Sequence, residues 1–219
     1  KQDYNKAKEY YERSAELGHS TAMVNLGALY ANGYGVKQDY NKAKEYYERS
    51  TELSHSDAML NLGTLYNDGY GVKQDYNNTK EYYERSTEPS NSKAMVNLGA
   101  LYANGYGVKQ DYNKAKEYYE RSAKLGNSVA MLSLGLLYDN GDGVKQDSNK
   151  AKEYYERSTE LGNSVAMLYL GVLYDNGRGV KQDYNKAKEY YERSAELGHS
   201  TAMVNLGALY ANGYGVKQD

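Results

Sequence analysis

The residues of this sequence best suited to bind a metal ion are its three histidines, His19, His55 and His199. They occupy one equivalent place in a recurring pattern, where the other copies carry Asn91, Asn127 and Asn163. A metal site needs several ligands converging on one point, and histidines in separate copies, with no cysteine nearby, make poor ligands. We interpret this position as a polar residue linking two helices, and we predict no metal site.

Two short stretches superficially match ligand-binding loops. Gly33 and Gly35 form a G-x-G pattern, but the third glycine of a dinucleotide-binding loop and the lysine of a P-loop are missing. Residues 139–143, with the sequence DNGDG, lack the ligands at the third and fifth positions of a calcium loop and its closing glutamate. No nucleophile–base pair stands out among the Ser, His and Asp residues. We therefore predict no enzyme, no catalytic residue and no cofactor.

A repeat positions all of these residues. The stretch from Asn25 to Ser50 returns unchanged at 97–122, and with a few substitutions at 61–86, 133–158 and 169–194, always at a spacing of 36 residues. A fixed period of this length is typical of a stacked repeat array. Six copies fill residues 1–216, so we expect one continuous array over residues 1–219 rather than separate globular domains.

The first element of each copy is predicted to be a helix over residues 4–17. Asp3 stands at the N-cap position, and Gly18 is suited to end the helix in a left-handed conformation. Apolar and small residues follow i, i+3, i+4 spacing on one face, with charged residues on the other. Glu9 and Arg13 are expected to form an i,i+4 ion pair.

The second element is predicted to be a helix that Ser20 caps and that runs to about Ala31. Gly27 lies inside it in every copy, although glycine in a helix costs about 0.5–1 kcal/mol relative to alanine. We attribute this glycine to the close approach of a neighbouring helix.

A structural turn then leads to the next copy. Gly33 and Gly35 are expected to adopt positive φ, and Asp39 to cap the following helix. Pro89 predicts that the helix before it stops by Glu88. Neither helix can bury its apolar face alone, so the pairs must stack. The predicted fold class is all-α, an α/α superhelical solenoid of antiparallel helix pairs with about 12 helices and a concave groove.

The recurring pattern resembles the Sel1-like repeat, a relative of the tetratricopeptide repeat. The residues of one copy that carry the resemblance are Ala22, Leu26, Gly27, Tyr30, Gly33, Gly35, Val36, Asp39, Ala43, Tyr46 and Tyr47. The resemblance implies full repeats starting at about residues 20, 56, 92, 128 and 164, with half-repeats at 1–19 and 200–219. It also implies an adaptor or scaffold without catalytic activity.

The copies differ at positions equivalent to 21, 25, 28 and 31, whose spacing places them on one face of the second helix. In arrays resembling this one, that helix lines the concave side. The fourth and fifth copies present apolar residues there, with an exposed tyrosine as a candidate hot spot, and the second and third copies present polar ones. The candidate binding residues are Val129, Ser133, Leu136, Val165, Tyr169 and Val172, together with Asp57, Asn61, Lys93 and Asn97. Drift between recently duplicated copies is the alternative explanation for these differences.

Charge and composition limit the partners. The formal net charge is −2, and no basic stripe follows the repeat, so nucleic acid is not an expected partner. No run approaches the roughly 18 apolar residues of a transmembrane helix. With no cysteine, the sequence does not indicate a redox compartment or a localisation.

Two functions fit the repeat. The first is a non-enzymatic scaffold that binds a protein or peptide along the concave groove. The alternative is a structural protein that assembles head-to-tail with itself into a rod or fibre, because residues 1–36 and 181–216 are identical and neither is a polar cap. A segment of a longer array also fits the sequence.

Overall fold

The computed structural model describes residues 3–88 and 90–215 of the chain. The described residues form an all-α structure with twelve helices and no strand, as the repeat predicts. The helices are α1 (Tyr4–Glu16), α2 (Ser20–Asn32), α3 (Tyr40–Glu52), α4 (Ser56–Asp68), α5 (Tyr76–Thr87), α6 (Ser92–Asn104), α7 (Tyr112–Lys124), α8 (Ser128–Asn140), α9 (Ser148–Glu160), α10 (Ser164–Asn176), α11 (Tyr184–Glu196) and α12 (Ser200–Ala211).

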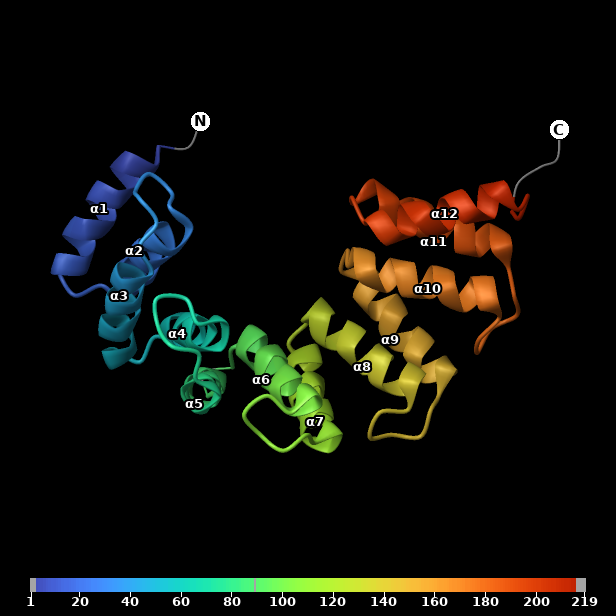
Figure 1. Ribbon diagram of the computed structural model, residues 1–219, viewed down its shortest axis with the longest axis horizontal. Coiled ribbons are helices and arrows are strands. Elements are labelled where there is room, and N and C mark those ends of the chain that lie inside the picture. The colour runs from blue at the N-terminus through green and yellow to red at the C-terminus, as the bar shows by residue number, and fades with distance from the viewer. Residues whose placement is uncertain (1–2, 89, 216–219) are drawn as a thin grey trace. The chain divides into compact units, whose positions relative to one another are not determined.

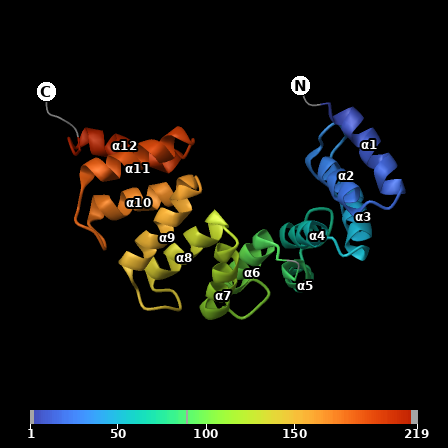
Figure 2. The same ribbon diagram turned by 180° about the vertical axis from the view of Figure 1, so that it is seen from behind.

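The helices fall into two compact units that divide between Gln110 and Asp111. The N-terminal unit holds α1–α6 and the C-terminal unit holds α7–α12. Within each unit a helix packs chiefly on the helices that precede and follow it in the chain, which gives a stack of helix pairs (Figures 1 and 2). The solenoid of helix pairs predicted from the sequence is confirmed.

The odd-numbered helices begin where the sequence predicts, and α1 ends at Glu16, one residue before the predicted end. The side chain of Asp39 caps α3 by accepting a hydrogen bond from the backbone N–H of Lys42, at 3.1 Å. Gly18 follows α1 with a φ of +85°. The recurrent surface ion pair lies one residue earlier than the expected one, between Lys8 Nζ and Glu12 Oε1 at 2.7 Å. The expected Glu–Arg pair is present in the third repeat, between Glu81 and Arg85 at 3.6 Å. α5 ends at Thr87, in agreement with the predicted stop, whereas Pro89 lies outside the described residues.

The even-numbered helices begin one residue earlier than predicted. Ser20 is the first residue of α2 and not its cap, because the N-cap position belongs to His19. The histidine makes no side-chain capping bond, but asparagine at the same position does. Asn91, for example, accepts hydrogen bonds from the backbone N–H groups of Lys93 and Ala94, at 3.1 and 3.2 Å. The histidine position is thus the start of a helix.

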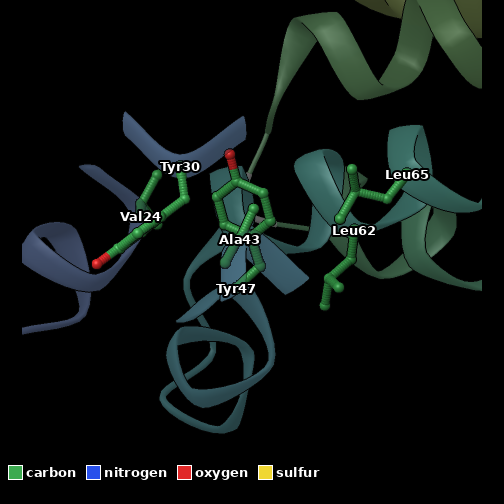
Figure 3. Packing of buried hydrophobic residues seen from close by; sticks show 7 residues of the cluster. Val24, Tyr30, Ala43, Tyr47, Leu62 and Leu65 are labelled. Carbon is green, nitrogen blue, oxygen red and sulfur yellow. The ribbon is translucent and has the colours of Figure 1, made fainter. Parts of the chain in front are cut away.

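The glycine inside each even-numbered helix marks a close contact, as predicted. A Cβ added to Gly63 would lie 2.6 Å from the ring of Tyr83, and the ring of Tyr47 covers Gly27 in the same way. Figure 3 shows Tyr47 of α3 between residues of α2 and of α4, in a cluster that also contains Val24, Tyr30, Ala43, Leu62 and Leu65. Each buried tyrosine therefore joins two successive repeats.

The turn after each even-numbered helix has the conformation that its glycines predict. Gly33 and Gly35 have φ values of +71° and +67°. Gly35 also passes so close to α1 that a Cβ there would lie 2.6 Å from the Cβ of Tyr4. Tyr34 of the same turn stacks on Tyr4 with ring centroids 5.0 Å apart, which fixes the turn against the preceding repeat.

Candidate binding surface

The variable residues of the C-terminal unit lie on two even-numbered helices, α8 and α10. We name five of them the apolar strip: Val129, Leu136, Val165, Tyr169 and Val172. Val129 is 48% exposed, and the other four are half-buried and pack against the core. Ser133, beside them on α8, is also half-buried and donates a hydrogen bond to the backbone carbonyl of Val129, at 3.0 Å.

Tyr169 is less exposed than the sequence predicts. Its ring stacks on the fully buried ring of Tyr155 in α9, with centroids 5.3 Å apart and planes 19° from parallel. The expectation of a freely exposed tyrosine was wrong, because the side chain folds down between α9 and its own helix. One part of the ring nevertheless remains at the surface of the strip.

The variable residues of the N-terminal unit are polar, and two of the four contact other side chains of the structure. Asp57 of α4 accepts a hydrogen bond from Asn91 Nδ2, at 2.9 Å, and so supports the residue that caps α6. Asn61 is half-buried, and Lys93 is exposed. The side chain of Asn97 forms a hydrogen bond with the hydroxyl of Tyr83, which also meets Thr64 Oγ1 at 3.3 Å. Two of these four predicted site residues therefore support neighbouring structure.

The position equivalent to Asn25 has a role that the sequence did not indicate. Besides Asn97 beside Tyr83, Ser133 lies beside the hydroxyl of Tyr119 and Asn205 beside that of Tyr191, and each polar side chain lowers the pKa of its tyrosine. In the fifth repeat, Tyr169 takes this position. The hydroxyl of Tyr155 is left without a hydrogen-bond partner as a result. The sequence indicates this difference only by one copy that carries a tyrosine where the other copies carry asparagine or serine.

An ion pair distinguishes the same region. Arg178, in the turn after α10, donates from its guanidinium to Asp139 Oδ2, at 3.1 Å. Asp139 is only 4% exposed, and its other oxygen, Oδ1, has no partner. In the first repeat the equivalent positions carry Ala31 and Tyr34.

The buried tyrosine hydroxyls are weak acids. Burial raises the pKa of Tyr47 and of Tyr119 to about 12. Burial also raises the pKa of Tyr155, and the nearby carboxylate of Asp139 raises it further. The pKa of Tyr83 is raised by burial, but its hydrogen bonds to Thr64 and Asn97 act in the opposite direction. These hydroxyls stay protonated at neutral pH and serve as packing and hydrogen-bonding groups.

The described residues hold no group of three or more His, Cys, Asp or Glu side chains placed to bind a metal ion. Two residues of the DNGDG stretch have other partners: Asp139 binds Arg178, and Asn140 donates to Asp142 Oδ2 at 3.2 Å. In the described part of the chain, no helix combines the length and the apolar character needed to cross a membrane. What the surface offers is an apolar strip bordered by a buried carboxylate.

A sequence model of the Sel1 repeat matches residues 1–19, 20–55, 56–88, 92–127, 128–163, 164–199 and 200–219. The chain belongs to the Sel1 repeat family. Sel1 repeat proteins are generally protein-interaction scaffolds, and the family is typically non-catalytic. None of the curated proteins matches this sequence.

Solved structures of Sel1 repeat proteins resemble this one. The protein c5321, a protective antigen present in uropathogenic Escherichia coli strains, is 32% identical with a TM-score of 0.87, over 97% of this chain. This Sel1 repeat chain spans only 45% of the length of c5321. A Sel1 repeat protein from Oxalobacter formigenes is 36% identical with a TM-score of 0.85, over 90% of this chain and 80% of its own. The immunity protein Pa5087 from Pseudomonas aeruginosa, 24% identical with a TM-score of 0.63 over 88% of this chain and 74% of its own, shares the fold alone.

Proposed function

We propose that this chain is a non-enzymatic scaffold that binds an apolar segment of a partner protein along the apolar strip of α8 and α10. The observation that carries the proposal is that two helices with nearly the same buried residues carry different residues on one face. α2 and α10 share their glycine and all their buried residues except one, where α2 has Val24 and α10 has Leu168. On the variable face α2 has Thr21, Asn25 and Ala28, whereas α10 has Val165, Tyr169 and Val172. Apolar residues gathered on one face of a repeat array are typical of a binding surface.

Four side chains of the apolar strip are half-buried, which suits them to bind a partner. Residues that are already held against the core lose little conformational entropy when a partner covers them. Tyr169 is anchored by its stacking on Tyr155 and presents the rest of its ring to the strip. A rigid aromatic residue among aliphatic ones is a common form of binding hot spot.

The test uses a pool of synthetic eight-residue peptides randomised among Leu, Val, Tyr, Ser and Gly. The immobilised chain captures peptides from the pool, and mass spectrometry quantifies what is retained. The variant with both Tyr169→Asn and Leu136→Ala takes the residues that the first repeat has at Asn25 and Ala28, so it is expected to fold. We expect it to retain at least tenfold less peptide than the wild type.

A control carries two changes at the equivalent positions of the N-terminal unit. Asn61→Ala with Thr64→Ala on α4 is expected to leave retention within twofold of the wild type. Undiminished retention by the variant with Tyr169→Asn and Leu136→Ala would reject the strip as the binding surface.

Head-to-tail assembly is the second candidate, and the near-identity of α1 and α3 favours it. α1 repeats 12 of the 13 residues of α3, with alanine in place of one threonine, so α1 of a second copy fits α12 as α3 fits α2. In that contact Tyr11 would cover Gly207 as Tyr47 covers Gly27.

Such a contact joins two different surfaces and therefore produces open chains of molecules. Sedimentation velocity over a hundredfold range of concentration tests it. We expect a mass that rises with concentration, and a Gly207→Leu variant that stays monomeric because the added side chain blocks the tyrosine. A wild-type monomer at every concentration would reject assembly.

A further inference from the structure

Tyrosine rings stack in pairs between successive repeats, where odd-numbered helices begin. In each pair the first residue of the helix meets the tyrosine in the turn that follows the next helix, with ring planes within 16° of parallel. The ring centroids of Tyr40 and Tyr70, for example, are 4.9 Å apart. We name these four the turn pairs: Tyr4–Tyr34, Tyr40–Tyr70, Tyr76–Tyr106 and Tyr184–Tyr214.

The turn pairs are open to solvent. The four tyrosines of the turns are between 44% and 51% exposed, and their partners on the helices are half-buried. The hydroxyl oxygen of Tyr40 accepts a hydrogen bond from Gln38 Nε2 at 2.9 Å, which leaves its proton available to water. An oxidant in solution can therefore reach these rings, and water can take up the proton that leaves.

A second set of stacked tyrosines has cations beside its rings. The rings of Tyr30 and Tyr46 lie 5.8 Å apart, with Lys42 Nζ 5.1 Å from the centre of the Tyr30 ring. The guanidinium of Arg49 lies 5.7 Å from the centre of the Tyr46 ring. A positive charge over a ring opposes the loss of an electron from it. We name these the flanked pairs: Tyr30–Tyr46, Tyr66–Tyr82, Tyr138–Tyr154 and Tyr174–Tyr190.

We propose that the turn pairs are modification sites, at which a haem peroxidase with hydrogen peroxide joins successive repeats by a dityrosine bond. Each phenol gives up one electron and its hydroxyl proton, and the unpaired electron spreads to the ring carbons beside the oxygen. Two of these carbons then form a C–C bond, and the hydrogen on each moves to its phenolic oxygen. The pair loses two hydrogen atoms in all, and one hydrogen peroxide takes them up to become two water molecules.

The geometry of the turn pairs favours coupling within one chain. Two rings held in contact meet at a far higher effective concentration than the rings of separate molecules. The new bond joins two ring edges, so one ring has to tilt out of the stack, and the exposed ring of the turn has room to do so. The bond staples neighbouring repeats as a disulfide does, in a chain that contains no cysteine.

Two other outcomes compete with the proposal. The turn pairs can be packing contacts alone, in which case oxidation yields no bond between their rings. Exposed tyrosines of separate molecules can also couple, in which case the bond appears only in covalent dimers and larger species. The amount of dityrosine within the single chain is therefore the quantity to measure, and it does not depend on the apolar strip.

The experiment treats the full chain at low concentration with a haem peroxidase and hydrogen peroxide. A denaturing gel isolates the single chain, and the fluorescence of dityrosine measures the yield. Mass spectrometry of a tryptic digest then locates the bond. The pair Tyr76–Tyr106 suits this mapping, because its peptides 74–80 and 94–109 each occur once in the digest. We expect these two peptides to be recovered joined, with the loss of two hydrogen atoms.

Two matched variants locate the reaction, and each replaces four tyrosines by phenylalanine, which can stack but has no hydroxyl to oxidise. The turn variant is expected to give at least fivefold less dityrosine in the single chain than the wild type. The flanked variant is expected to stay within twofold of the wild type. Circular dichroism checks that both are helical. The turn variant changes Tyr34, Tyr70, Tyr106 and Tyr214, and the flanked variant changes Tyr46, Tyr82, Tyr154 and Tyr190.

Three results would overturn the proposal. The first is a wild-type single chain without dityrosine, whether or not covalent dimers form. The second is a turn variant whose single chain gives as much dityrosine as the wild type. The third is a fivefold loss in the flanked variant with none in the turn variant, which would assign the bond to the flanked pairs.

Discussion

The even-numbered helices of the two units share a frame and differ in one face. α4 and α10 both carry a buried alanine, a buried methionine, buried leucines and the glycine that a tyrosine ring covers. On the variable face, α4 has Asp57 and Asn61 where α10 has Val165 and Tyr169. Two of the four polar residues of the N-terminal unit, Asp57 and Asn97, support neighbouring side chains, whereas Tyr169 leaves the hydroxyl of Tyr155 without a hydrogen-bond partner. The difference shows that the buried core of the even-numbered helices does not require the residues of the apolar strip.

We expect large and equal losses of stability when the glycine inside an even-numbered helix is replaced in either unit. Gly63→Leu and Gly171→Leu each force a side chain into the ring of a buried tyrosine, Tyr83 or Tyr191. We expect each variant to lose about 3 kcal/mol of stability or more, from the displaced ring. Urea unfolding followed by circular dichroism measures the loss.

The matched control for that prediction is Gly207→Ala in α12. No atom lies within 4 Å of a Cβ at this glycine, and alanine favours a helix by about 0.5–1 kcal/mol over glycine. We expect unchanged or slightly higher stability. A loss at Gly207 equal to that at Gly63 would mean that the tyrosine ring does not set the cost.

The buried tyrosines predict unfolding in alkali in both units. Burial raises the pKa of Tyr47 in the N-terminal unit and of Tyr119 in the C-terminal unit from 10.0 to about 12. The native state therefore holds these protons more tightly than the unfolded state. The resulting stability is fully present below pH 10 and is lost as the pH rises from about 10 to 12, by about 3 kcal/mol for each tyrosine.

Thermal melts at pH 9, 10, 11 and 12 measure this dependence, and Tyr47→Phe provides the control. The variant has no hydroxyl to ionise, so its melting temperature is expected to fall less steeply above pH 10. Identical pH profiles for the variant and the wild type would show that Tyr47 does not contribute.

Removing one hydroxyl in each unit should change stability in opposite directions. Tyr83→Phe removes the hydroxyl that lies 3.3 Å from Thr64 Oγ1, while Thr64 keeps its hydrogen bond to the carbonyl of Leu60, and we expect a loss of about 1 kcal/mol. Tyr155→Phe deletes a hydroxyl that has no partner, and we expect a gain of about 1 kcal/mol. Urea unfolding of the two variants measures both changes. A loss in Tyr155→Phe as large as that in Tyr83→Phe would show that the hydroxyl already has a partner in solution, such as a water molecule.

The helix pairs and the turns were predictable from the sequence because they depend on residues that are close together in the chain. The repeat predicted the helix pairs, Gly27 predicted a close contact, and Gly33 and Gly35 predicted their positive φ. The predicted start of the even-numbered helices was one residue late because serine is a preferred N-cap residue, whereas the structure gives the N-cap position to His19, which makes no side-chain capping bond.

The features of the candidate site depend on packing between repeats, which the pattern does not contain. Asp139 and Arg178 are 39 residues apart, and their pairing requires knowing that a turn reaches back to the preceding even-numbered helix. Tyr169 appeared exposed because its helix face is variable, but the ring of Tyr155 in the neighbouring helix draws it inward. The orphaned hydroxyl of Tyr155 follows from that contact.

Methyl NMR tests the central claim, that an apolar segment binds the strip of α8 and α10, most directly. The chain is labelled at its valine and leucine methyl groups and titrated with the peptide most enriched from the pool. The account predicts shifted signals from Val129, Leu136, Val165 and Val172, with unshifted signals from Val24, Leu60 and Val96 in the N-terminal unit. Shifts in the N-terminal unit alone, or bound peptide with no shift in the four strip residues, would contradict it.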